Sequence, residues 1–108
     1  MSRARFDLAD LVAENYGGAR PDADTLLVGD WVKAGFVART PDPRREWMWL
    51  VIVARNEDSS FIGELRNEPL QGFAAFNDHV RFQARHVLTT MSPEEMAFRQ
   101  QPMTSGLH

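Results

Sequence analysis

The chain contains no cysteine among its 108 residues. This absence excludes disulfide bonds, zinc sites built on thiolates and catalysis by a cysteine nucleophile. It is consistent with a reducing compartment, and we predict a cytoplasmic location. The sequence also has no apolar run close to the roughly 18 residues of a membrane span, and its first residues lack the apolar stretch of a signal peptide.

A strong charge of either sign is missing as well. The chain carries 12 Lys and Arg against 15 Asp and Glu, which gives a formal net charge of −3. No region is basic enough to indicate nucleic-acid binding, because such binding depends mainly on neutralising phosphates. Eleven of the 12 cations are Arg, a residue that suits planar ion pairs and interfaces.

Residues that could carry a reaction are few and scattered. Ser59 and Ser60 lie in a predicted turn without the sequence frame of a nucleophile. His79 and His86 are seven positions apart, and we expect them on opposite faces of one strand, where they would not share a metal. We therefore predict no catalytic residue, no metal and no cofactor, and we expect that the protein is not an enzyme.

The longest apolar run, residues 46–53 (EWMWLVIV), carries a single charge at Glu46. Apolar side chains on both faces are typical of a strand at the centre of a packed sheet. Trp47 and Trp49 point to the same side of this strand. Their rings are either buried there or mark a binding patch on a face that the rest of the chain does not fully cover.

Four strands are predicted, over residues 31–39, 46–55, 61–66 and 79–87, with turn residues between them. Alternation of apolar and polar residues assigns one side of each strand to the core. The residues that we expect to be almost fully buried are Phe36, Leu50, Ile52, Leu65 and Phe82.

A helix is predicted over residues 7–16, with Asp7 as N-cap and Gly17-Gly18 at its end. Asp7, Asp10 and Glu14 would gather on its solvated side, where acids near a helix N-terminus are favourable. Its apolar residues recur at helical spacing, namely Leu8, Leu11, Val12 and Tyr16.

A second helix is predicted over residues 92–101, because Ser92 and Glu95 have the spacing of a capping box. A chain of this length forms one domain, here residues 1–108. We predict an α+β fold with an N-terminal helix, a twisted antiparallel sheet of four to five strands and a short C-terminal helix. A sheet that curls into a half-barrel is a variant of this prediction.

Four segments occur in an order that resembles one family: residues 29–36 (GDWVKAGF), 46–51 (EWMWLV), 61–69 (FIGELRNEP) and 77–82 (NDHVRF). The "E-x-M-W" and "N-x-P" pieces are the most specific. On these motifs the chain resembles the DUF2314 (YegJ-like) family of small bacterial domains of unknown function, over about residues 28–88. The resemblance implies a compact bacterial α+β module, and some members resemble immunity or accessory proteins of toxin systems. It implies no reaction and no catalytic residue.

The polar side of the predicted strands carries five candidate partner-binding residues: Trp31, Lys33, Arg66, Arg81 and Arg85. Glu64 lies on the same side, so this face is either a solvated, salt-bridged surface or a surface for a partner. We predict a non-catalytic interaction module that binds another protein, immunity-like or accessory in kind. The alternative is binding of a small ligand or a nucleic acid through the same face.

Overall fold

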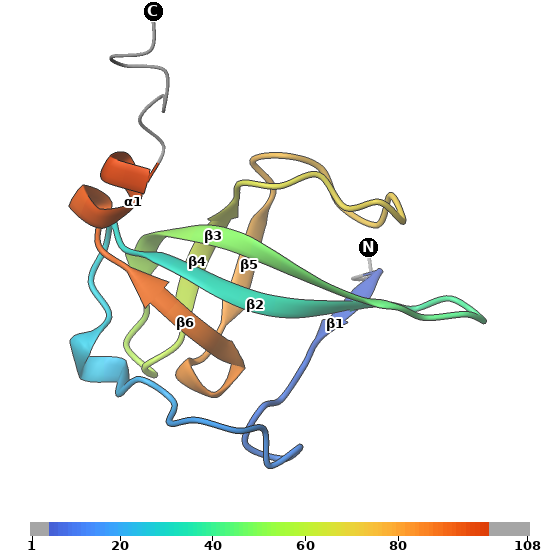
Figure 1. Cartoon of the computed structure of the whole chain (residues 1–108), viewed down its shortest axis with the longest axis horizontal. Coiled ribbons are helices and arrows are strands. Elements are labelled where there is room, and N and C mark those ends of the chain that lie inside the picture. Colours follow the sequence, from blue (N-terminus) through green and yellow to red (C-terminus); the bar gives the residue numbers. More distant parts are fainter. Residues whose placement is uncertain (1–4, 100–108) are drawn as a thin grey trace, which may run out of the picture.

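A computed structural model describes residues 5–99 and shows a curled antiparallel sheet, a half-barrel, that ends in one helix (Figure 1). Five strands follow one another across the sheet: β1 (Phe6–Leu8), β2 (Trp31–Ala38), β3 (Arg45–Arg55), β4 (Phe61–Leu65) and β5 (His79–Phe82). A sixth strand, β6 (Val87–Met91), pairs with the first half of β2, while β1 pairs with its second half. Two 3-10 turns, η1 (Ala23–Thr25) and η2 (Ala84–His86), precede β2 and β6, and helix α1 (Pro93–Arg99) follows β6. The α+β class is confirmed in this coarse form, with six strands in place of four or five.

The hydrophobic core lies on the concave side of the sheet. All five residues that the alternation assigns to the core are at most 1% exposed, as predicted: Phe36, Leu50, Ile52, Leu65 and Phe82. The Phe82 ring stacks on Phe61 of β4 with ring centroids 5.3 Å apart. Phe73, from the loop between β4 and β5, stacks on Phe36 at 6.1 Å. The sequence pattern therefore assigned the inward side of each strand correctly.

The predicted helix over residues 7–16 is wrong. Residues Phe6–Leu8 form β1 on the edge of β2, and only one turn, at residues 11–15, follows. Asp10 begins that turn, because its carboxylate accepts hydrogen bonds from the N–H groups of Val12 and Ala13 at 3.1 and 3.0 Å. The strand pairing is non-local, and it outweighs the helical spacing of the apolar residues.

The three acids of this segment each reach an arginine instead of forming a solvated helix face. The pairs are Asp7 with Arg39 at 2.5 Å, Asp10 with Arg85 at 3.0 Å and Glu14 with Arg45 at 2.6 Å. These pairs attach the N-terminal segment to the residue after β2, to the first residue of β3 and to η2.

The predicted strand over residues 79–87 is interrupted. Strand β5 ends at Phe82, η2 turns the chain, and β6 begins at Val87. The N–H of Gln83 donates to His86 Nδ1 at 3.0 Å and closes this turn. The prediction that His79 and His86 lie on one strand is therefore wrong, because His79 is in β5 and His86 is in η2.

The capping box of the C-terminal helix is confirmed. The N–H of Glu95 donates to the Ser92 hydroxyl at 3.1 Å, and the N–H of Ser92 donates to the Glu95 carboxylate at 2.8 Å. The structure describes this helix as Pro93–Arg99, and the last two residues of the predicted range, 100 and 101, lie outside the described part. No helix within residues 5–99 is long and apolar enough to cross a membrane.

Candidate functional site

The outer, convex face of the sheet carries the tryptophans. Strand pairing places Lys33 opposite Trp49 and Gly35 opposite Trp47, so both tryptophans of β3 lie on this face, together with Trp31 of β2. All three indole rings are partly buried. The prediction that Trp47 and Trp49 share one side of the strand is confirmed, and each end of this face has a different cover.

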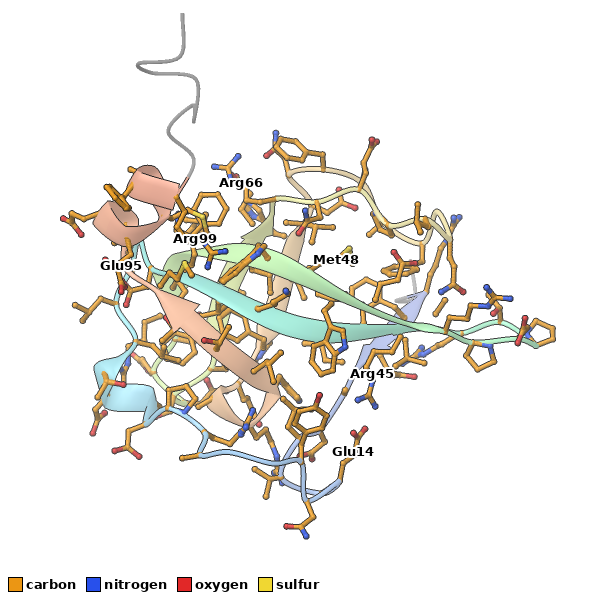
Figure 2. All side chains as sticks on the ribbon, in the orientation of Figure 1. Glu14, Arg45, Met48, Arg66, Glu95 and Arg99 are labelled. Carbon is orange, nitrogen blue, oxygen red and sulfur yellow. The ribbon has the colours of Figure 1, made fainter. Side chains whose placement is uncertain are left out.

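The Trp47 end of the face is closed by the N-terminal segment. The Tyr16 ring lies 5.6 Å from the Trp47 ring, and the Arg45 guanidinium lies 5.2 Å above the same indole. Figure 2 shows Arg45 and Glu14 pointing toward one another, where they form the 2.6 Å ion pair. Gly35 leaves room for this packing, because a Cβ there would lie 3.1 Å from the Trp47 ring.

The Trp49 end remains open. Trp31 meets Trp49 edge to face, with ring centroids 6.5 Å apart and planes at 71°, and Lys33 Nζ lies 5.6 Å from the centroid of the Trp49 ring. Beside them is a hollow of about 500 Å³, which we call the tryptophan groove. It is lined by Trp31, Trp49, Arg66, Asn67, Phe76 and Met96.

Arg66 is held firmly at the side of the tryptophan groove. Its guanidinium pairs with Glu64 at 2.9 Å, donates to Asn77 Oδ1 at 3.0 Å and lies 5.7 Å from the Phe76 ring centroid. Its Nε is buried and has no hydrogen-bond partner among the described residues. Figure 2 shows Arg66 on the side of the molecule where α1 lies, which is the helix that supplies Met96 to the groove.

The loop after β4 completes the wall of the groove by replacing a strand. Strand β3 pairs with β4 only from Leu50 onward, so its earlier residues need other partners. The N–H of Trp49 donates to Asn67 Oδ1 at 2.6 Å, and the Trp49 carbonyl accepts the N–H of Arg66 at 2.9 Å. The Glu46 carboxylate accepts the N–H of Leu70 at 2.8 Å.

These bonds assign a structural role to the most distinctive motif positions. Glu46 of "E-x-M-W" and Asn67 of "N-x-P" fasten the loop to β3, and no chemistry is needed to explain them. Gly29 and Asp30 also have structural roles. Gly29 has a positive φ of 101°, and the Asp30 carboxylate accepts the N–H of Leu27 at 3.0 Å.

The five predicted partner-binding residues separate into two groups. Trp31, Lys33 and Arg66 come together around Trp49. Arg81 and Arg85 do not join them. Arg81 forms an ion pair with Asp58, and Arg85 forms the ion pair with Asp10. Sequence reasoning missed Asn67, Phe76 and Met96 as groove residues, because a loop and a helix bring them to the sheet from distant positions; only the motif around Asn67 offered a signal.

The acids of these exposed pairs are shifted toward the charged form. The hydroxyl and N–H of Ser60, followed by Arg81, lower the pKa of Asp58. The N–H of Ala13 lowers the pKa of Asp10, and Arg85 adds to this effect. Pairs that are this exposed contribute little to stability, but they leave less unbalanced positive charge on the strand face.

A second hollow, of about 980 Å³, lies between β1 and β5, and we call it the seam. Residues from both strands line it, together with Phe73, Asp78 and His86. Burial lowers the pKa of His86, so its imidazole is neutral at pH 7, and its Nδ1 already accepts the N–H of Gln83. Within residues 5–99 no three His, Asp or Glu side chains gather as a metal site would require.

Comparison of the whole chain with family models, with curated proteins and with solved structures returned no match. The likeness to the DUF2314 (YegJ-like) family therefore stays a prediction from the motifs.

Proposed function

We propose that this protein is a non-catalytic module that binds another protein through the tryptophan groove. The observation that carries the proposal is the open end of the outer face, where Trp31 and Trp49 stand beside Lys33 and Arg66. The immunity-like or accessory role that the family resemblance implies is one form of such a function.

The composition of the groove supports a protein partner. Tryptophan, phenylalanine, methionine and arginine are the residue types enriched at protein interfaces, and all four line this hollow. Phe76 at its rim is 48% exposed. A partner that covers this surface would bury apolar area that the chain itself leaves in water.

The test is a binding measurement with a partner recovered by pull-down from the native host. Trp31→Ala should weaken that affinity by about 2 kcal/mol or more, because a few tryptophan and arginine anchors usually carry most of the binding energy. Tyr16→Ala is the matched control, since Tyr16 is a partly exposed aromatic residue at the closed Trp47 end. Equal losses from both variants would contradict the proposal.

A small ligand is the second candidate, and the shape of the groove favours it. Two indole rings at 71° with a guanidinium and an amide beside them could hold a planar polar molecule. Mass spectrometry of the protein purified without denaturation tests this candidate. A bound compound that quenches tryptophan fluorescence and is lost in Trp49→Ala would replace the protein partner as our conclusion.

A further inference from the structure

The two outermost strands of the path from β1 to β5 cannot pair with each other in an antiparallel way. Every neighbouring pair from β1 to β5 is antiparallel, so β1 and β5 run in the same direction. These two strands border the seam, and neither pairs with the other. Leaving aside β6, which pairs with β2 off this path, the five strands from β1 to β5 need one more strand, opposite in direction to both edges, to form an all-antiparallel ring.

The backbone of β1 offers hydrogen bonds to such a strand. Arg5 O accepts from Arg39 N at 2.9 Å, and Ala9 N donates to Gly35 O at 2.9 Å, so Arg5, Asp7 and Ala9 use their backbone groups toward β2. Because these directions alternate along an antiparallel strand, the N–H and C=O groups of Phe6 and Leu8 point into the seam.

The backbone of β5 also has N–H and C=O groups that can bond to such a strand. Leu65 N donates to Asp78 O at 2.8 Å, and the register then directs the backbone groups of Val80 and Phe82 toward β4. The N–H and C=O groups of His79 and Arg81 consequently face the seam. No backbone hydrogen bond satisfies them within residues 5–99.

Side chains around the seam define what would fit. On the inner side, Phe6, Leu8, Phe73 and Val80 line the hollow and pack on the core. On the outer side, Asp7 is already paired with Arg39, and Arg81 with Asp58. Arg5 lines the seam without an ion pair among the described residues, so an acid opposite it would be complementary.

We propose that the seam binds an extended segment of a partner protein as an additional strand, antiparallel to both β1 and β5. Its inward residues are apolar and meet Phe6, Leu8 and Val80, while its outward residues include an acid near Arg5. Main-chain hydrogen bonds supply affinity in this mode, and alternate side chains supply specificity. The site shares no residue with the tryptophan groove, so the two proposals stand or fall separately.

An array of synthetic peptides tests the proposal directly. The probes are seven-residue, acetylated and amidated peptides with valine at alternate positions and glutamate, threonine or lysine between them. We expect the glutamate series to bind at least tenfold more tightly than the lysine series. Methylation of an inner backbone nitrogen should weaken binding at least tenfold, whereas methylation at the terminal residue should not. This part of the test depends on no protein variant.

Amide hydrogen exchange locates the bound peptide. The seam-facing amides of Leu8 and Arg81 should become at least tenfold more protected, while Asp7 and Val80, which already bond within the sheet, should change less. The matched variants are Arg81→Pro and Arg81→Ala, since both lose the ion pair to Asp58 and only the first loses the seam-facing N–H. Arg81→Pro should bind at least tenfold more weakly than Arg81→Ala.

Four results would overturn the proposal. They are an array in which no peptide binds below 1 mM (about −4 kcal/mol), binding that tolerates inner methylation, protection that falls on the tryptophan groove, and seam protection in the free protein that disappears on dilution. The last result would mean that a second copy of the chain occupies the seam. Trp31→Ala should leave the affinity for the peptides unchanged. The test of the seam is therefore independent of the test of the tryptophan groove.

Discussion

The absence of a side chain at Gly63 lets Leu50 and Phe82 pack closely against β4. A Cβ at this position would lie 2.9 Å from Leu50 Cβ and 3.1 Å from the Phe82 ring, closer than packed atoms approach. Gly63→Ala should therefore lower the free energy of unfolding by about 1–3 kcal/mol, the usual cost of overpacking. Urea denaturation measures this change, and Gly17→Ala is the control, because no atom lies within 4 Å of a Cβ at Gly17. An unchanged midpoint in Gly63→Ala would mean that β3 and β4 pack less closely.

The burial of single residues could be predicted from the sequence, whereas the partners of charged residues could not. Alternation along a strand is a local property, and it assigned Phe36 and Leu50 to the core correctly. The pair of Arg85 with Asp10 joins positions 75 apart, and the pair of Arg81 with Asp58 joins positions 23 apart. Such contacts depend on the path of the chain in space. The sequence alone therefore did not predict that both arginines form ion pairs within the protein.

At the scale of elements, the two ends of the chain carried similar helix signals, and only one signal was correct. Ser92 and Glu95 form their capping box inside the last element, where local geometry decides. At the other end, the second half of β2 needs a partner strand, and Phe6–Leu8 provides it. Backbone pairing along that edge, with Phe6 packed 5.1 Å from Phe36, favours a strand over the helix that the spacing predicts.

The Asn67 side chain is one of the groups that fasten the loop after β4 to β3. Asn67→Ala would leave the partly buried N–H of Trp49 without its 2.6 Å acceptor. We expect a loss of about 1–3 kcal/mol in unfolding free energy, the cost of an unsatisfied buried donor. Asn67→Asp keeps an acceptor of the same shape and should retain most of the stability in the same thermal unfolding experiment. Equal losses in both variants would show that the amide acts through its N–H₂ group.

The cap of α1 is an independent unit of stability. Ser92→Ala removes the hydroxyl that accepts the N–H of Glu95 and should cost about 1 kcal/mol. Ser92→Asp restores an acceptor at the N-terminal end of the helix, where a negative charge is also favourable. Hydrogen exchange at Glu95 should therefore accelerate in the alanine variant alone. Acceleration in both variants would indicate that the hydroxyl proton, not the oxygen, is essential.

At the scale of the whole molecule, the positions of β2, β3 and β4 follow from the sequence, but the number of strands, their pairing and the closure of the sheet do not. Turn residues mark the ends of β2, β3 and β4 clearly. No glycine or proline marks the break between β5 and β6, which depends on Gln83 and His86 bonding to one another. The tryptophan groove and the seam both arise from that curl, since each lies between elements that only the folded chain brings together.

The shifted pKa values of one histidine and three aspartates make the molecule sensitive to acid in two stages. Burial lowers the pKa of His86, and hydrogen bonds lower the pKa values of Asp7, Asp10 and Asp58, led by Arg39, by the N–H of Ala13 and by Ser60 respectively. In each case the unfolded chain binds a proton at a higher pH than the folded chain does. The unfolding free energy therefore falls with falling pH, first below about 6.5 where an unfolded histidine titrates, then below about 4 where carboxylates do.

Urea denaturation between pH 8 and pH 3 separates the two stages. His86→Asn keeps an acceptor for the N–H of Gln83 but does not titrate, so the loss of stability between pH 7 and pH 5 should become smaller. His79→Asn is the control, because His79 is exposed and its replacement should leave that loss in place. The carboxylate stage below about pH 4 should persist in both variants. A smaller loss between pH 7 and pH 5 in His79→Asn, but not in His86→Asn, would contradict this explanation. It would mean that burial of His86 in η2 does not cause the first stage.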